Sequence, residues 1–237
     1  RAIVALVMAL TVLPIAPFVP APPPETWWLI ALSMVVHWFY QFCAIRALHR
    51  GALSLVFPVM RGLGPLATAA LAAVLLHEKL ALWQVAGLVL ASLSILVFAL
   101  PTGATHEARR LDRAAMFWAM MTAVGVGLYA VADTKAARAM PTPFTFIVWL
   151  FLIDWIGVTL VLAWQRRGRV VASLRPEMRN GVIGGIAGSV SYGMAIYAYT
   201  LTDAAMVTAL RETSVVFAAG FGAWLLFTAS SSSRRAS

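Results

Sequence analysis

Three charged side chains stand inside long apolar runs of the sequence. Arg61 and Arg211 lie in two such runs, and Asp154 lies at the midpoint of a third, 144–164. An ionised group at the centre of a bilayer costs at least about 2.5 kcal/mol, so it should face a bundle interior, a water-filled cavity or a group of opposite charge. We therefore expect all three side chains to face protein or water and to point away from lipid.

The two arginines are candidates for binding an anion or a carboxylate, because a guanidinium group offers a planar fork of N–H donors. The alternative for Arg61 is a structural role on the carbonyls of a helix end. Arg211 is followed by Glu212, and neighbours on a helix point about 100° apart, so the two cannot face one partner. Arg211 is therefore either an anion clamp or, with Glu212, a tie between helices.

Asp154 must be paired, hydrated or protonated, because it lies in the middle of its apolar run. Arg61 and Arg211 are its expected partners, and a proton-titrating carboxyl group is the alternative. Asp133 and Lys135 stand near the end of another apolar run. For these two residues the sequence predicts a position at the membrane interface.

Polar aromatic and amide side chains inside the apolar runs are candidates for lining a cavity. Tyr40, Gln41 and Tyr192 are the main ones, with ordinary helix packing as the alternative, since tyrosine hydroxyls find partners readily in helix bundles. Small residues between Gly181 and Gly188 repeat at a spacing that favours close helix contact.

Composition places the chain among membrane proteins. Of its 237 residues, 62% are hydrophobic and 11% charged, against about 45 to 50% apolar and about 25% charged in soluble domains. The net charge of +9 comes mostly from short links such as 106–113 and 164–180, where cations hold helix ends at lipid headgroups. We expect no nucleic-acid binding, because no basic face with interleaved aromatics appears elsewhere.

The sequence contains no recognisable catalytic or metal-binding pattern. Cys43 is the single cysteine and the four histidines are scattered, so no disulfide, metal site or cofactor is expected. Walker, zinc-protease and nucleophile-elbow motifs are absent from the sequence. The protein is therefore not expected to be an enzyme.

Eight apolar segments are predicted as transmembrane helices in an all-α fold. Most approach the roughly 20 residues that cross a bilayer, whereas the first is short and contains Pro14 and Pro17. The predicted segments are 3–18, 27–48, 53–76, 82–100, 114–132, 144–164, 182–200 and 204–228.

An internal repeat relates the two halves of the chain. Arg61 aligns with Arg211 at an offset of 150 residues, and the segment 41–48 aligns with 192–199 at an offset of 151. In this register no closing helix follows the second half, and no helix precedes the first half to match 114–132. The pattern predicts two repeats, 1–104 lacking its first helix and 105–237 lacking its last and ending in a polar Ser/Arg tail.

Three segments resemble the drug/metabolite transporter superfamily, of the type with two EamA repeats. LHEKLALWQVAGLVLASLSILVFAL (76–100) is similar to the Gly-Glu-Arg-Leu link and helix that close such a repeat, and LSLVFPVMRGLGPL (53–66) and ALRETSVVFA (209–218) resemble the preceding helix. The resemblance implies inverted repeats around a central cavity and alternating access in a multi-pass inner-membrane transporter of small organic metabolites or drugs. Arg61 and Arg211 would then face a shared path.

The resemblance leaves several alternatives open. A non-transporting membrane scaffold or an incomplete, inactive transporter fragment is the second interpretation, and a homodimer is an open possibility beside the lipid bilayer and a small-molecule substrate. Related multidrug transporters couple export to protons through a glutamate in the first helix of the repeat. The matching helix here has no acid until Asp133, which argues against that coupling.

Membrane orientation also stays open. The family arrangement would place the HEKL link (77–80) in the cytoplasm, whereas the basic links near Arg109 and Arg166 favour the opposite orientation under the positive-inside rule.

Overall fold

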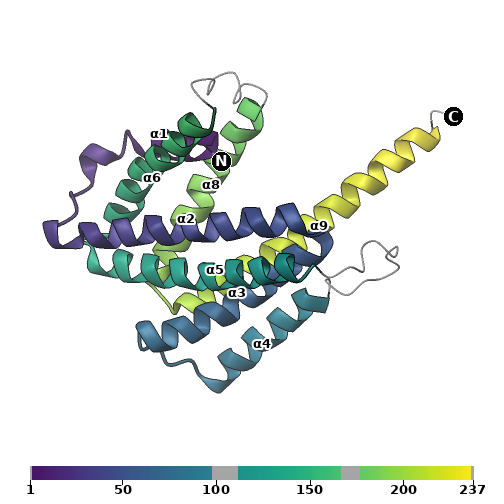
Figure 1. Cartoon of the computed structure of the whole chain (residues 1–237), viewed down its shortest axis with the longest axis horizontal. Coiled ribbons are helices and arrows are strands. Elements are labelled where there is room, and N and C mark those ends of the chain that lie inside the picture. The colour runs from purple at the N-terminus through teal and green to yellow at the C-terminus, as the bar shows by residue number, and fades with distance from the viewer. Residues whose placement is uncertain (1, 98–111, 167–176, 236–237) are drawn as a thin grey trace.

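The computed structural model describes residues 2–97, 112–166 and 177–235, and within these ranges it is built from helices without strands (Figure 1). Two single-turn 3₁₀ helices, Ala16–Phe18 and Pro24–Thr26, lie between the first two α-helices. The α-helices are α1 (Ala2–Val12), α2 (Trp27–Arg50), α3 (Leu53–Leu75), α4 (Leu82–Val97), α5 (Arg113–Ala139), α6 (Pro143–Arg166), α8 (Met178–Tyr199) and α9 (Ala204–Arg235).

Six of the described helices are long and apolar enough to cross a membrane: α2, α3, α5, α6, α8 and α9. The other two predicted spans are shorter, because α1 has 11 residues and the described part of α4 has 16. At about 1.5 Å per residue, α1 covers about 17 Å of a hydrocarbon layer of about 30 Å. It ends just before Pro14 and Pro17, which do not continue a helix interior.

Helix α5 lies at the centre of the bundle, packed along α2 and α3 and also touching α6, α8 and α9. Small residues make this possible. A Cβ atom on Gly127 would lie 2.8 Å from the carbonyl carbon of Ala67 in α3, and one on Gly125 would lie 3.0 Å from the Cα of Tyr40 in α2. The backbone of α5 can therefore approach two neighbours at once.

The predicted glycine packing surface is confirmed between α8 and α1. A Cβ on Gly181 would lie 2.6 Å from a methyl of Ile3, and one on Gly185 would lie 2.5 Å from the Cβ of Val7. The side chains of α1 thus occupy the space that the missing side chains of α8 leave.

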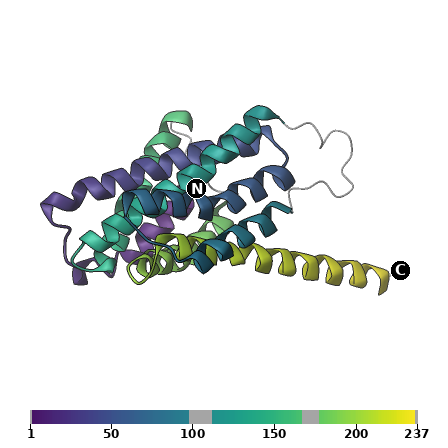
Figure 2. The same ribbon diagram turned by 90° about the horizontal axis from the view of Figure 1, so that it is seen from below.

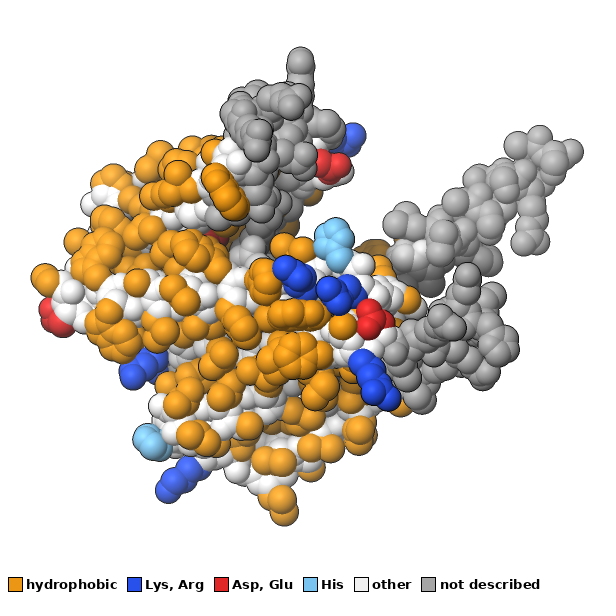
Figure 3. All heavy atoms as spheres, viewed as in Figure 1, with side chains coloured by type: hydrophobic (Ala, Val, Ile, Leu, Met, Phe, Trp, Pro, Cys, Tyr) orange, Lys and Arg blue, Asp and Glu red, His pale blue; other side chains and the backbone are white. Residues whose placement is uncertain are grey.

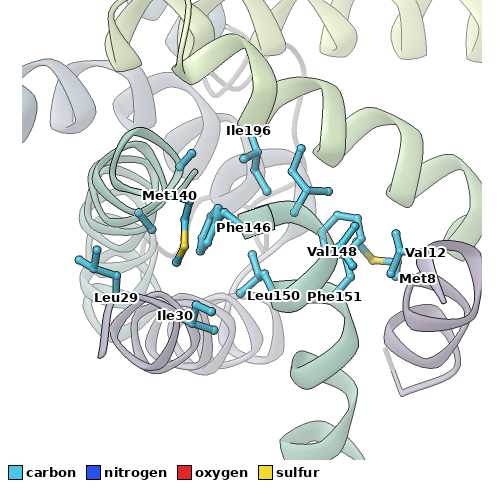
Figure 4. Packing of buried hydrophobic residues seen from close by; sticks show 13 residues of the cluster. Met8, Val12, Leu29, Ile30, Met140, Phe146, Val148, Leu150, Phe151 and Ile196 are labelled. Atoms are coloured by element: carbon cyan, nitrogen blue, oxygen red, sulfur yellow. The ribbon is translucent and has the colours of Figure 1, made fainter. Parts of the chain in front are cut away.

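The largest apolar cluster joins α1, α2, α5, α6 and α8. Figure 4 shows the cluster extending from Leu29 and Met140, past Phe146, to Met8 and Val12. Phe146 is fully buried. Hydrophobic side chains also cover much of the outer face seen in Figure 3. Large apolar side chains are exposed on the described residues, for example Leu82 at 85% and Trp83 at 73%. An apolar exterior around an apolar core is the arrangement of a polytopic helical membrane protein.

Helix α9 continues beyond the bundle, as Figures 1 and 2 show. Its 32 residues run through the predicted polar tail as far as Arg235. Most of the two basic links lies outside the described residues, in 98–111 and 167–176.

The small residues around Arg61 pack against neighbouring helices. A Cβ on Gly62 would lie 3.0 Å from Leu96 in α4, and one on Gly64 would lie 3.2 Å from Val126 in α5. Pro58 and Pro65 are buried inside α3 as well.

Candidate functional site

A cavity of about 320 Å³ lies between the helices of the two halves. Its walls come from α1, α2, α5, α6, α8 and α9. We call it the central cavity. It is lined by Val4, Met8, His37, Tyr40, Tyr129, Leu150, Phe151, Asp154, Gly184, Gly188, Ser191, Tyr192 and Arg211.

Aromatic rings form much of the cavity wall and contact one another. Tyr129 stacks on His37 with ring centres 4.7 Å apart and meets Tyr40 edge to face at 5.2 Å. Phe151 stacks on Tyr192 at 5.9 Å. Such rings offer flat apolar faces for an organic group and negative π-faces for a cation.

Two side chains of opposite charge line this cavity together. Arg211 comes from α9, and its guanidinium carbon lies 5.5 Å from the ring centre of Tyr192. Asp154 comes from α6, in the middle of its span. The expectation that Arg211 and Asp154 face the bundle interior agrees with this arrangement.

A second hollow of about 270 Å³ adjoins the central cavity. Arg61 and Arg211 both line it, as the predicted repeat requires, and Ser191 and Arg211 line both spaces. The remaining lining residues, all from α9, are Leu210, Thr213, Ser214 and Phe217. Arg211 therefore stands where the two spaces meet.

Glu212 points away from Arg211 and pairs with Arg61 of α3. Arg61 Nε lies 3.2 Å from Glu212 Oε2, in an ion pair whose atoms are not aligned as a hydrogen bond. Arg61 also donates to Ser214 Oγ at 3.4 Å. The two neighbours in α9 thus have different roles: Glu212 ties α9 to α3, and Arg211 remains on the cavity wall.

Asp133 is completely buried, so its predicted position at the membrane interface is wrong. Its carboxylate accepts hydrogen bonds from Ser33 in α2 and Tyr192 in α8, and His37 Nε2 lies 3.8 Å away. Depth along α5 did not determine exposure, because α2 and α8 cover this end of the helix. Lys135, two residues later, is exposed and lies 5.5 Å from the ring centre of Trp28, in agreement with an interfacial position.

Gln41 is placed differently from its predicted neighbour Tyr40. Tyr40 lines the central cavity, whereas Gln41 is not among the residues that line either space. The Gln41 Nε2 atom is buried without a hydrogen-bond partner in the part of the chain that the structure describes. Adjacent positions on a helix point about 100° apart, which separates the two side chains.

Sequence reasoning missed the cluster of Ser33, His37 and Asp133 as a unit. One signal was present: Ser33 and His37 are four residues apart, so they share one face of α2. A second was the run of small residues before Asp133, which indicates close helix contact on that side of α5.

Residues 1–100 match the model of the EamA-like transporter family. No curated protein and no solved structure matches the chain. The match includes α1 to α4, with Arg61 and the 77–80 link; the second repeat and the boundary at 104 stay predictions. The first part of the chain is thus similar to the EamA-like transporter family, and the helices that the structure describes are those of a multi-pass helical membrane protein.

Proposed function

We propose that the protein is a secondary transporter of the inner membrane that moves a small anionic or zwitterionic organic solute by alternating access. The observation that carries this proposal is the central cavity, in which Arg211 and Asp154 stand on walls built by both halves of the chain. Its volume of about 320 Å³ is near the lower end of the range for small-molecule sites, about 300 to 1,000 Å³.

Arg211, Asp154 and the aromatic rings of the cavity would each bind a different part of such a solute. Arg211 offers its fork of donors to a carboxylate, and Asp154 offers acceptors to an ammonium group. The faces of Tyr40, Tyr129 and Tyr192 would contact the apolar part of the solute. An anionic solute without an amine would use Arg211 alone.

The packing of the helices supports movement of one half against the other. The predicted repeat relates α1 to α6 and α3 to α9, and each of these pairs is in contact. Transporters of this kind place the solute at the interface between repeats, near the bilayer midplane, and rock the repeats around it. The adjoining hollow, with Arg61 and Arg211 on its wall, extends the polar surface away from the central cavity.

Transport by purified protein in liposomes tests the proposal. A panel of labelled amino acids and other small carboxylates is supplied under imposed pH and sodium gradients, and uptake by wild type is compared with Arg211→Gln. Loss of charge-assisted hydrogen bonds of about 1.5 to 3 kcal/mol should reduce uptake at low solute concentration by at least about tenfold.

Arg46→Gln is the matched control, because Arg46 is an exposed arginine stacked on Phe42 of the same helix, away from the cavity. It should leave uptake unchanged, and both variants should elute as folded protein with wild-type helix content. Equal uptake by Arg211→Gln and wild type would remove Arg211 from the site. Folded wild-type protein that moves no solute of the panel would favour the scaffold interpretation.

A further inference from the structure

The cluster beside the central cavity contains one hydroxyl between two proton acceptors. Tyr192 Oη contacts the carboxylate of Asp133 and lies 2.7 Å from His37 Nε2. On the other side of the imidazole, His37 Nδ1 lies 2.8 Å from the backbone carbonyl oxygen of Ser33. A carbonyl oxygen only accepts, so Nδ1 carries a hydrogen and donates it.

The single hydrogen of Tyr192 cannot serve both neighbours. If Asp133 is a carboxylate and His37 is neutral, both present an acceptor to the same hydroxyl group, and one contact is left without a proton. Two arrangements satisfy every contact. Either His37 is an imidazolium that donates to Tyr192, which donates to Asp133, or Asp133 is a carboxylic acid that donates to Tyr192, which donates to neutral His37.

Both satisfied arrangements contain one proton more than carboxylate plus neutral imidazole. We infer that Asp133, Tyr192 and His37 form a binding site for one proton, and that the structure corresponds to its loaded form. Ser33 completes the site, because its hydroxyl donates to the other carboxylate oxygen of Asp133. Protein covers Asp133 completely, so its carboxyl group depends on Ser33 and Tyr192 for hydrogen bonds, without water as a substitute.

The proton site has a route to solvent through the central cavity. His37 and Tyr192 line that cavity, whereas Asp133 lies behind them. A proton can therefore pass from cavity water to His37 Nε2 or Tyr192 Oη and on to Asp133 without a change of helix packing.

Tyr192 belongs to both the proton site and the cavity that holds Arg211. Its hydroxyl touches Asp133 and His37, and its ring lies against Arg211 and Phe151. Loss of the proton leaves this hydroxyl with one of its two contacts and frees the ring to move. Because linkage between two binding sites is reciprocal, a solute on Arg211 would in turn change proton affinity.

Other ionisable groups near the cluster come from every helix around it. Tyr129 of α5 stacks on His37, and Tyr199 of α8 is buried. Arg211 of α9 and Asp154 of α6 face the shared cavity. Arg61 of α3, which lines the next hollow, pairs with buried Glu212 of α9. The described part of α1 has no ionisable side chain.

The coupling step rests on the proposed transport function, whereas proton binding does not, so the test needs no solute. Full-length protein with ¹⁵N-labelled histidine is reconstituted in bilayers, and the His37 signals, assigned by their loss in His37→Gln, are followed from about pH 5 to about pH 9. We expect the His37 transition to move by at least about one pH unit in Asp133→Asn relative to wild type. Glu25→Gln, which removes an exposed carboxylate outside both spaces, should leave it within about 0.3 unit of wild type.

The same His37 titration in wild type and Asp133→Asn would overturn the proton site.

A second measurement tests the link to the cavity. Ser191 is exposed on the wall that both spaces share, so Ser191→Cys in a Cys43→Ala background gives one thiol there. The rate at which a membrane-impermeant reagent labels this thiol is measured at each pH. It is divided by the rate in the same protein with Asp133→Asn added. Taking this ratio removes the effect of pH on the ionisation of the thiol itself. The ratio should change by at least about threefold across the His37 transition, and a ratio that is flat with pH would overturn the coupling.

Discussion

Two ion pairs of the same composition, Arg61–Glu212 and Arg138–Glu78, each join segments far apart in the sequence, but their surroundings differ. Glu78, in the link between α3 and α4, lies 2.9 Å from Arg138 and accepts from the first backbone N–H of α9, at Ala204, also at 2.9 Å. Arg138 donates to the carbonyl oxygens of Tyr199 and Thr202, both at 3.0 Å. Arg138 Nε and Nη2 and Glu78 Oε2 are thus bonded to backbone near helix ends, whereas Glu78 Oε1 meets Arg138 in an ion pair whose atoms are not aligned as a hydrogen bond.

The Arg61–Glu212 pair is less fully bonded. Its closest atoms lie 3.2 Å apart, also without hydrogen-bond alignment, and among the described residues its side chains make one hydrogen bond, the 3.4 Å contact of Arg61 to Ser214, with none to backbone. Arg61 lines a hollow, where water or a solute can reach it. The difference teaches that a charge pair with its remaining groups on backbone is a structural tie, whereas one beside a hollow stays open to a ligand.

Breaking the Glu78 tie should have the largest effect on stability. Glu78→Gln removes one of the two acceptors that Arg138 and the N-terminus of α9 need. We expect a loss of about 2 to 3 kcal/mol in the free energy of unfolding, less than the roughly 3 to 5 kcal/mol for a fully buried pair, because Arg138 is 37% exposed.

Denaturation of purified protein in mixed micelles, followed by loss of helix signal, gives this value. Lys79→Gln is the control, since Lys79 is an exposed neighbour in the same link. An unfolding free energy for Glu78→Gln within error of Lys79→Gln would contradict the structural tie.

The Arg61 pair should tolerate the same change better. In Glu212→Gln the amide oxygen still accepts from Arg61, and water in the hollow can solvate the guanidinium group. The expected loss is about 1 to 2 kcal/mol in the same assay. Thr213→Ala controls for a change on the neighbouring exposed turn. A loss for Glu212→Gln as large as that for Glu78→Gln would erase the distinction between the two pairs.

Substitution of Gln41 should have the smallest effect on the free energy of unfolding, because the amide nitrogen of this side chain lacks, among the described residues, a partner of the kind that each ion pair has. Its buried Nε2 has no partner among the described residues, so Gln41→Met removes an unsatisfied group and should leave stability within about 0.5 kcal/mol of wild type or raise it. Gln84 accepts from the backbone N–H of Ala81 at 2.7 Å and donates to Asp203 at 3.5 Å. Gln84→Met should therefore lose about 1 kcal/mol; a larger loss for Gln41→Met than for Gln84→Met would reveal a bonded role for Gln41.

Sequence patterns predicted the fold class and part of the site. Apolar run lengths indicated the spans because a helix must satisfy its backbone within lipid, and six of the described helices are long and apolar enough to cross. The repeat that aligns Arg61 with Arg211 anticipated that both would line one hollow. The assignment of Asp133 to the interface failed, because distance from a helix end says nothing about which neighbours cover that end.

The sequence did not predict which charged or polar side chains pair with one another. Glu212 follows Arg211 directly, yet it pairs with Arg61, 151 positions away in α3. Ser33, His37 and Tyr192 converge on Asp133 from two other helices. No local spacing encodes such contacts, because they depend on how α2, α8 and α9 are arranged around α5.

The sequence by itself determined that this chain is a helical membrane protein and that a few charges stand at depths where lipid cannot hold them. It did so because the cost of exposing backbone and charge to hydrocarbon acts on each segment separately. The tertiary structure alone decided which charges face the cavity, which pair with one another and which share a hydroxyl group. Those outcomes depend on the distances between helices, and the close approach permitted by the small residues of α5 and α8 sets them.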